Sequence, residues 1–363
     1  MSEARRKAIV IHSPYSGRSA RLEDALAHLR EAGIEVVEQM AVSELDGLPP
    51  QGSYWQKSGI NLAIAAGGDG LIGGVITHIA PSGLPLGIMP LGTANDIARS
   101  LNIPQDIDLA AQIIRAGRVQ EVDVGVAKPS EQAPHLTGKG ALAPLLAHIS
   151  TRKHGYFAHA LTIGLNVQFA RIATNIATRQ RYGRLTYPIA ALETLKYRDA
   201  LDVSLRFEGL AFPTDHDAKQ AKEMEELQSI SYQALQITVI NAPIFGGQWK
   251  LSVPNASIHD RLLDIVVIEE IEFSRLNTAL THFLYSLRQD HPSNNEPPPL
   301  APHPAELSAI PGIHHFQARG VLISTTADPR DVTLDGEVRG QTPIYVHLAD
   351  ERLRVVVPQD GDV

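Results

Sequence analysis

The 363-residue chain contains no cysteine and few aromatic residues, and it carries no excess of basic residues. The lack of cysteine excludes disulfide bonds, thiolate catalysis and cysteine-ligated zinc. Aromatic residues make up only 5% of the chain, so stacking on a ligand gives no clue to its identity. Because 40 acidic residues outnumber 32 basic ones, with a net charge of −8, we expect no nucleic-acid partner and no strong attraction to anionic lipid.

Long apolar runs are also missing. No stretch approaches the roughly 20 apolar residues that span a bilayer. Residues 1–7 are charged and lead directly into an apolar strand, which is not typical of a secretory signal. We therefore expect a cytoplasmic protein that contacts a membrane surface only transiently, if its substrate is a lipid.

The first 125 residues alternate between short apolar strands and helical segments. Residues 8–11 and 34–37 are strand-like, and between them Leu22, Ala25, Leu26 and Leu29 recur at helical spacing before Gly33. The same alternation continues to a helical segment at 109–116. This pattern predicts an α/β domain over residues 1–124, built on a doubly wound, mainly parallel sheet.

Short strand-like segments dominate the rest of the chain and predict a β-rich sandwich domain over residues 125–349. The segments lie at 157–162, 201–207, 235–240, 262–268, 321–324 and 353–357, and one helical exception lies at 168–198. We expect the tail, from about 350 to 363, to pack back on the first domain. Residues 128–153, 215–228 and 290–311 have the composition of surface insertions.

The strongest functional signal is the turn Gly67-Gly68-Asp69-Gly70, which directly follows the apolar run 62–66. Glycine allows a tight turn and a close approach to a ligand, and backbone N–H groups before a helix favour anions. An acid beside phosphate is explained if a magnesium ion lies between them. Taken alone, the tetrapeptide is equally typical of an ordinary turn, and it is not a Walker motif.

A second turn, at residues 90–96, follows the strand-like run 86–89. Gly92 frees its backbone, while Thr93 and Asn95 offer a hydroxyl and an amide for ligand contact. Asp96 suits the cap of the following helix at least as well as it suits a ligand. In a parallel sheet, ligands bind at the carboxyl ends of strands, where both turns are expected. Together the two turns predict a polyphosphate site.

These motifs resemble those of the diacylglycerol kinase-type lipid kinases, a family that includes sphingosine kinases and bacterial lipid kinases. The second turn reproduces the family's Pro-Leu-Gly-Thr-Ala-Asn-Asp in full. The resemblance spans nearly the whole chain. It continues at Asn241 with Phe245-Gly246-Gly247, at Pro254-Asn255-Ala256, at Asp260 with Leu262-Leu263-Asp264, and at Leu334-Asp335-Gly336-Glu337.

The resemblance implies an ATP- and Mg²⁺-dependent kinase that phosphorylates a hydroxyl of a diacylglycerol- or sphingoid-like lipid, with the nucleotide in a cleft between the domains. It implies that Glu337 is the general base, that Asp123 assists it at the domain junction, directly or through a magnesium-bound water, and that Asp69 helps to place magnesium. A structural magnesium site would use the Asp260 side chain and the Leu262 carbonyl, and a homodimer is expected from bacterial relatives. The implied nucleotide-binding residues are Ser13, Ser16, Gly17, Gly67, Gly68, Asp69, Gly70, Gly92, Thr93 and Asn95.

The chain departs from the family pattern at several places. Leu71 replaces a threonine, Gly73-Gly74 replaces an Asn-Glu pair, and Ser13 replaces the asparagine of Asn-Pro-x-Ser-Gly. His259 replaces an acid and Arg261 replaces a glycine. These differences bear on metal binding and catalytic efficiency more than on the nucleotide site.

Two other interpretations remain open. Residues 335–337 lie between strand-like runs at 331–334 and 344–346, so Glu337 also fits a solvated hairpin tip, and Asp123 an exposed strand residue. Because NAD kinases share the Gly-Gly-Asp-Gly loop, the protein also fits a kinase of a soluble substrate related to them. Leu71 and Gly73-Gly74 leave open a lipid- or nucleotide-binding protein with impaired catalysis. The proximity of Glu337 to the phosphate loop discriminates between these readings.

Overall fold

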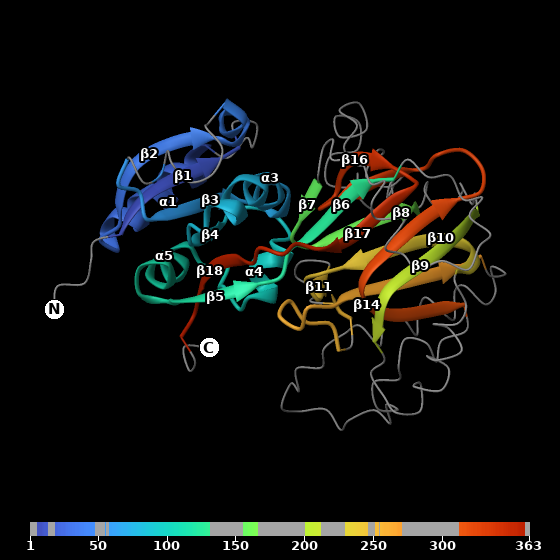
Figure 1. The fold of residues 1–363 in the computed structure, drawn as a ribbon. Coiled ribbons are helices and arrows are strands. Elements are labelled where there is room, and N and C mark those ends of the chain that lie inside the picture. The colour runs from blue at the N-terminus through green and yellow to red at the C-terminus, as the bar shows by residue number, and fades with distance from the viewer. Residues whose placement is uncertain are drawn as a thin grey trace, which may run out of the picture.

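The computed structural model describes residues 6–13, 19–47, 55, 58–130, 155–165, 200–211, 229–245, 251–253, 255–270 and 312–359. Ser16, Gly17, Pro254, Gly246, Gly247, the expected helical segment at 168–198 and most of the three expected insertions lie outside these residues. Figure 1 shows an α/β lobe beside a β-rich lobe, with both chain ends at the α/β lobe.

The first lobe is built on a six-stranded sheet, as the alternating pattern predicts. Its order is β2 (Glu35–Ala41), β1 (Lys7–His12), β3 (Leu62–Gly67), β4 (Leu86–Pro90), β18 (Leu353–Val357) and β5 (Arg118–Val122). The strands from β2 to β4 pair in parallel, and β18 pairs parallel to β4 and antiparallel to β5. β4 is buried along its whole length and β3 along all but its last residue, which is typical of parallel strands with both faces covered.

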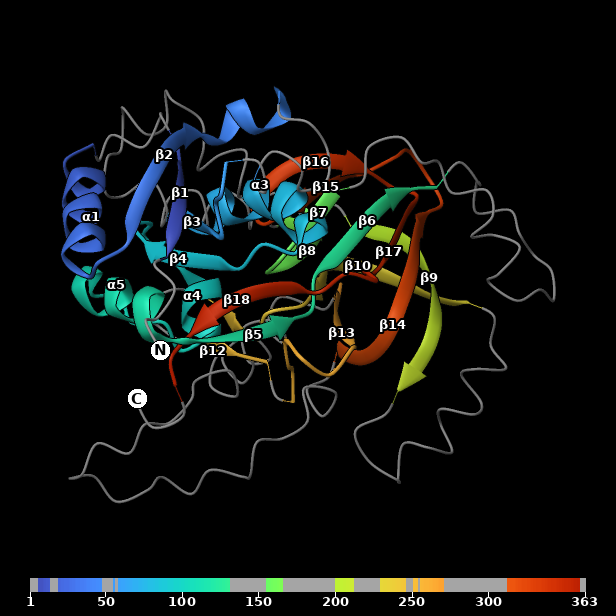
Figure 2. The ribbon, with the colours of Figure 1, turned by 60° about the vertical axis from the view of Figure 1, so that its left-hand side comes forward.

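Helices cover both faces of this sheet. They are α1 (Ser19–Glu31), α3 (Asp69–Ile79), α4 (Asp96–Ser100) and α5 (Ile107–Ala116), with 3₁₀ turns η1 (Val42–Gly47) and η2 (Ala80–Ser82). α1 packs beside α5, and α3 packs over β3 and against the second lobe at β7 (Gly155–Phe157) (Figure 2). Asp106 accepts a hydrogen bond from Leu109 N at 3.0 Å and so caps α5. Within the described ranges, no helix combines the length and apolar character that crossing a bilayer requires.

The second lobe is an antiparallel sheet of ten strands. β9 (Leu201–Ala211) pairs with both β10 and β14 and curls the sheet, and β11 (Ile244–Phe245) pairs with β12 (Leu251–Ser252) outside it. The other strands follow the order β16 (Glu337–Gln341), β15 (Asp331–Leu334), β8 (Ala160–Gly164), β10 (Ile230–Ile240), β13 (Leu263–Glu269), β14 (Ile313–Thr325), β17 (Ile344–Leu348), β6 (Gly125–Pro129) and β7. The expected fold class, an α/β domain followed by a β-rich domain, is confirmed.

Two local expectations are wrong. The single strand expected at 157–162 is interrupted, because the backbone N–H groups of Ala158 and His159 donate to the Asp335 carboxylate instead of to a neighbouring strand. The hairpin tip considered at 335–337 is present, but the strand-like run at 344–346 is not its second strand and pairs with β14 and β6. Asp335 and Gly336 have φ angles of 48° and 84°, so they form a two-residue turn that pairs β15 directly with β16.

The C-terminal strand β18 lies inside the first sheet, between β4 and β5 (Figure 2). The chain therefore crosses between the lobes twice in the described residues, at 123–124 and at 349–352. Val355, Val356 and Val357 are at most 2% exposed. The core of the first lobe thus depends on residues that come last in the chain.

We expect Val355→Ala to lower the free energy of unfolding by about 2 kcal/mol, because it removes two methyl groups from a fully buried site. Val119 of the neighbouring β5 is 40% exposed, so Val119→Ala is the matched control and should change stability far less. Urea denaturation of both variants measures the difference. Equal losses would show that β18 does not pack as described.

Candidate active site

Strand register brings the predicted loops to one edge of the first sheet. His12 pairs with Ala66, and Gly67 pairs with Pro90. The residues that follow β1, β3 and β4 therefore lie side by side, with Ser13 at the end of β1. This is the carboxyl edge of the parallel strands, where ligands bind in such sheets.

The two glycine loops touch through their backbones. Leu91 N donates to Gly67 O at 3.0 Å. A Cβ on Gly92 would lie 2.5 Å from Gly68 Cα, and a Cβ on Gly68 would lie 3.0 Å from Gly92 Cα. Glycine at both positions therefore lets the loops meet, in addition to opening the backbone toward a ligand.

Asp69 joins these loops through its side chain. It is the first residue of α3, and its Oδ1 accepts a hydrogen bond from Ile97 N at 3.0 Å, in the first turn of α4. A negative charge at a helix N-terminus is favourable. Asn95, and not Asp96, holds the N-cap position of α4, with φ 53° and no side-chain cap bond. Asp69 therefore supplies from another loop the hydrogen bond that a local cap would make.

Asn95 is buried beneath the loops, and one of its two polar atoms has no partner. Its Nδ2 donates to Gln105 Oε1 at 2.8 Å and to the carbonyls of Gly92 and Pro90 at 3.2 and 3.3 Å. Its Oδ1 is buried without a hydrogen bond, and a Cβ on Gly68 would lie 3.6 Å from it. A buried acceptor without a partner costs about 1–3 kcal/mol, which a ligand N–H or O–H between the loops would offset.

Glu337 reaches this loop from the other lobe. It is the first residue of β16, and its Oε1 lies 3.5 Å from the position that a Cβ on Gly70 would take. Its Oε2 accepts hydrogen bonds from Nε of Arg339, at 3.0 Å, and from Nη2. The Glu337 side chain is 55% exposed. A solvent-exposed carboxylate therefore faces the N-terminal turn of α3.

The Asp335 carboxylate holds the turn that carries Glu337. Its Oδ2 accepts from Ala158 N at 3.0 Å, and its Oδ1 accepts from His159 N at 2.9 Å and Ala160 N at 3.1 Å. Burial raises the pKa of Asp335 above its usual value, although the charge of His159 and the three backbone N–H groups act in the opposite direction. The turn is thus attached to the β7–β8 connection.

The same turn packs against α3 at Gly73. A Cβ on Gly73 would lie 2.6 Å from Asp335 Oδ2, which is closer than a real contact allows. Gly70 and Gly73 lie one helical turn apart on α3, so one face of the helix meets both Glu337 and Asp335. Gly73, which departs from the family pattern, is therefore required by the packing that brings the two lobes together.

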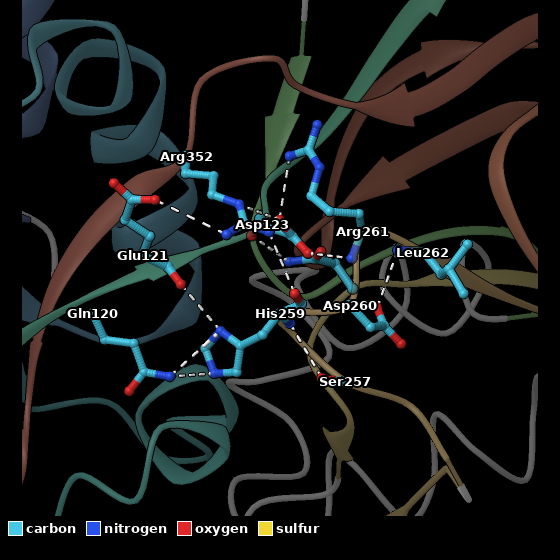
Figure 3. A network of polar contacts seen from close by, with 10 residues as sticks. Gln120, Glu121, Asp123, Ser257, His259, Asp260, Arg261, Leu262 and Arg352 are labelled. Atoms are coloured by element: carbon cyan, nitrogen blue, oxygen red, sulfur yellow. Dashed lines mark hydrogen bonds and ion pairs between the residues drawn. The ribbon is translucent and has the colours of Figure 1, made fainter.

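Asp123, predicted to lie at the domain junction and to assist Glu337 there, lies at the junction in an ion-pair cluster between the lobes (Figure 3). Its carboxylate is fully buried and accepts hydrogen bonds from Arg261 N at 2.8 Å and Arg261 Nη1 at 3.2 Å. It also forms an ion pair with Arg352, whose Nε lies 3.1 Å from Asp123 Oδ1. Glu337 is paired with Arg339 and takes no part in this cluster. The described contacts of Asp123 are therefore those of a residue that holds the junction.

Asp260 and Leu262, the predicted structural metal ligands, bind one another. Asp260 Oδ1 accepts a hydrogen bond from Leu262 N at 3.0 Å. Partial burial of the carboxyl raises the pKa of Asp260, and the nearby charges of Asp264 and Asp123 raise it further. Among the residues that the structure describes, no group of three or more His, Cys, Asp or Glu side chains is arranged to hold a metal ion.

Sequence reasoning missed two polar residues beside the loops and the junction. Arg21 of α1 donates through Nη1 to Leu91 O at 3.2 Å, which places a cation near the second loop. Asn241 was noted only as part of a motif, yet its Nδ2 bridges the carbonyls of Asp123 and Ala158 at 2.8 and 2.7 Å. The one available signal for Arg21 was its place near the start of the helix that follows β1.

Comparison with known proteins agrees with these two lobes. The sequence model of the family described as "Diacylglycerol kinase catalytic domain" matches residues 7–127. A second one, described as "YegS C-terminal NAD kinase beta sandwich-like domain", matches residues 160–286. The two matches fall on the α/β lobe and on part of the β-rich lobe, respectively.

Curated relatives match along almost their whole length. The chain is 24% identical over 361 residues to a diacylglycerol kinase of Staphylococcus saprophyticus, covering 98% of this chain and 97% of the relative. A diacylglycerol kinase of Staphylococcus epidermidis is also 24% identical, with 98% and 93% covered.

Solved structures from Bacillus anthracis share the fold. One, described as a diacylglycerol kinase, has a TM-score of 0.57 at 20% identity and covers 98% of both chains. Another has a TM-score of 0.61 at 22% identity and covers 99% of both chains.

We expect Gly73→Ala to destabilise the protein by about 1–3 kcal/mol, although alanine normally favours a helix by about 1 kcal/mol, because the added methyl group overlaps Asp335. Displacement of the turn should also lower any phosphoryl transfer by an order of magnitude or more. Gly74→Ala, whose Cβ meets only a methyl group of Val42 at 3.0 Å, is the matched control. Urea denaturation and turnover of both variants check the expectation, which fails if the two behave alike.

The raised pKa of Asp335 predicts a pH-dependent contribution to stability. Between its usual and its raised pKa the folded protein holds more protons at this site than the unfolded chain, so this contribution falls as pH rises through that window. The unfolding free energy of wild type minus that of Asp335→Asn should therefore be largest in acid. Urea denaturation of both proteins at a series of acid and neutral pH values measures this difference. A flat difference for Asp335 would contradict the burial argument.

Proposed function

Because the chain belongs to the diacylglycerol kinase-type family of lipid kinases, we propose that it transfers the γ-phosphoryl group of ATP to a hydroxyl of a diacylglycerol- or sphingoid-like lipid. One observation carries the proposal: Glu337 of the β-rich lobe faces Gly70 in the glycine loop of the α/β lobe. Phosphoryl transfer to an alcohol needs a phosphate cradle and a proton acceptor in one place.

The nucleotide would lie at the carboxyl edge of the first sheet. Backbone N–H groups at the start of α3 favour its phosphates, and the unpartnered Oδ1 of Asn95 offers an acceptor to a donor group of the nucleotide. Ser13 and Thr93 border the same edge, while Arg21 contributes a positive charge. Ser16 and Gly17 of the proposed site lie outside the described residues.

The residues at the loop are compatible with a nucleotide-bound magnesium ion. Mg²⁺ is commonly held by one or two carboxylates together with substrate phosphates, and here Asp69 lies in the loop while Glu337 faces Gly70 of the same loop. In its hydrogen bond to α4, Asp69 accepts through Oδ1, so Oδ2 takes no part in that bond. When bound, the ion would neutralise charge on the phosphates.

Glu337 would act as the general base. As the lipid oxygen bonds to the γ-phosphorus, the bond from that phosphorus to the β–γ bridging oxygen breaks, ADP leaves, and the hydroxyl proton passes to the carboxylate. Arg339 holds Oε2, so Oε1 is the oxygen that remains turned toward the loop. Asp123 would contribute by holding the two lobes in the orientation that keeps Glu337 near Gly70.

A lipid acceptor is favoured over a soluble one by the curated relatives, which carry the name diacylglycerol kinase and match over 98% of this chain. With a net charge of −8, we propose only transient contact with a membrane surface. The acceptor hydroxyl would approach beside the β15–β16 turn, where Glu337 is more than half exposed.

Transfer from labelled ATP to a panel of lipid alcohols in mixed micelles with Mg²⁺ tests the proposal. Glu337→Gln should lower kcat by about 10²–10⁴-fold, because the amide cannot accept the proton, while the KM for ATP changes little. Asp69→Asn should raise the KM for ATP and Mg²⁺ as well as lower kcat. Glu23→Gln, an exposed change on α1, is the control and should behave as wild type.

Three results would contradict parts of this proposal. Full activity in Glu337→Gln would exclude it as the base. Phosphorylation of a soluble alcohol, with no lipid product, would show that the protein is a soluble-substrate kinase. Binding of ATP without transfer to any acceptor would identify a nucleotide-binding protein with impaired catalysis.

A further inference from the structure

We propose that the guanidinium groups of Arg261 and Arg352 neutralise the junction between the lobes in place of a bound divalent cation, so that this junction needs no metal. The starting point is Asp123, a carboxylate with 0% exposure. A buried charge is costly unless it is paired and hydrogen-bonded, so a cation of some kind must face it.

Two arginines meet that requirement. Arg261 donates to Asp123 through its backbone N at 2.8 Å and through Nη1 at 3.2 Å, and Arg352 forms an ion pair with it, with Nε 3.1 Å from Oδ1. Figure 3 shows both side chains converging on Asp123. Both oxygens are thus contacted by positively charged residues, Oδ1 by both guanidinium groups and Oδ2 by the Arg261 backbone, so the carboxylate is paired without a metal ion.

The cluster joins three segments that are distant in the chain. Asp123 lies in the first crossover between the lobes, Arg352 lies in the second, and Arg261 precedes β13 of the second sheet. Backbone contacts support them, because Asp123 N donates to Ile258 O and Ala349 N donates to Val124 O, both at 2.8 Å. The charge pairs therefore lie where the two lobes are connected.

Asp260 and Leu262, the residues implied for a structural magnesium site, are not arranged to bind the ion. Asp260 Oδ1 already accepts from Leu262 N at 3.0 Å, and its side chain is turned toward Leu262 in Figure 3. The neighbouring carbonyl of His259 accepts from Arg352 Nη2 at 3.3 Å, so it is also engaged. A second cation next to the Arg261 guanidinium would be repelled.

The backbone conformation of Arg261 also supports the proposal. Its φ angle is 64°, in the left-handed region that favours glycine, which is the residue of the family pattern at this position. An arginine in this conformation carries backbone strain, and its contacts with Asp123 are what offset that strain here.

His259, at the position of the family's acid, is used for hydrogen bonding. Its Nδ1 lies 3.1 Å from Glu121 O, and its Nε2 lies 2.6 Å from Gln120 Nε2. The tautomer with the proton on Nδ1 satisfies both contacts. Where the pattern has an acid and a glycine, this chain therefore has a histidine that bridges to β5 and an arginine that pairs with Asp123.

Thermal unfolding of the full-length, nucleotide-free protein in EDTA and in MgCl₂ tests the proposal without relying on catalysis. Wild type should unfold at the same temperature in both. Arg261→Gly, which suits the backbone angle, should still lower Tm by several degrees in both conditions, because Asp123 loses a charge partner. Arg30→Ala, at an exposed position on α1, is the control and should leave Tm unchanged.

A double variant tests whether the guanidinium stands where a cation would bind. His259→Asp with Arg261→Gly should gain a Tm increase on addition of MgCl₂ that wild type lacks. Repeating each thermal scan in an Asp69→Asn background distinguishes the effect of magnesium bound at the nucleotide loop from the effect of magnesium bound at the junction. The proposal is overturned if the Tm of wild type rises with MgCl₂ and still does so in the Asp69→Asn background. It is also overturned if Arg261→Gly leaves Tm unchanged, or if MgCl₂ does not raise the Tm of the double variant.

Discussion

The geometry of the candidate active site depends on the Asp335 carboxylate. It binds the backbone N–H groups of Ala158, His159 and Ala160 and packs against Gly73 of α3. One side chain thus attaches the β15–β16 turn to its own sheet and to the helix that follows the glycine loop. Because Glu337 comes two residues later, this attachment is what carries the proposed base to the phosphate loop. Three hydrogen bonds to a charged group hold a turn more firmly than its two residues could.

The orientation of the two lobes also depends on the junction between them. The chain enters the second lobe at Asp123 and returns at Arg352, and these two residues form an ion pair. β18 then completes the first sheet between β4 and β5. The first lobe therefore cannot be completed until the second lobe has been traversed, which couples the two in folding as well as in the site they build.

Much of the candidate site could be predicted because its signals are local. Each glycine turn follows a buried strand, and parallel pairing brings the ends of those strands together. The roles of individual residues were less predictable. Asn95 was expected to contact ligand, yet its Nδ2 braces the loop while only Oδ1 is left for a ligand. Asp123 was expected at the domain junction, where it lies, but the two arginines from distant segments that bind it there were not expected. Gly73 looked like a lost polar residue, whereas its missing side chain makes room for Asp335.

By itself the sequence determined the alternation of strand and helix, the two glycine loops and the family resemblance, because these depend on residues close together in the chain. The tertiary structure decided which acid serves which purpose. Asp69, Asp123, Asp260, Asp335 and Glu337 are alike as isolated carboxylates, and they differ through burial and through partners up to 177 residues away. Charge pairing and desolvation act through space, so which acid lies at the junction, which holds the turn and which faces the glycine loop appears only when the chain has folded.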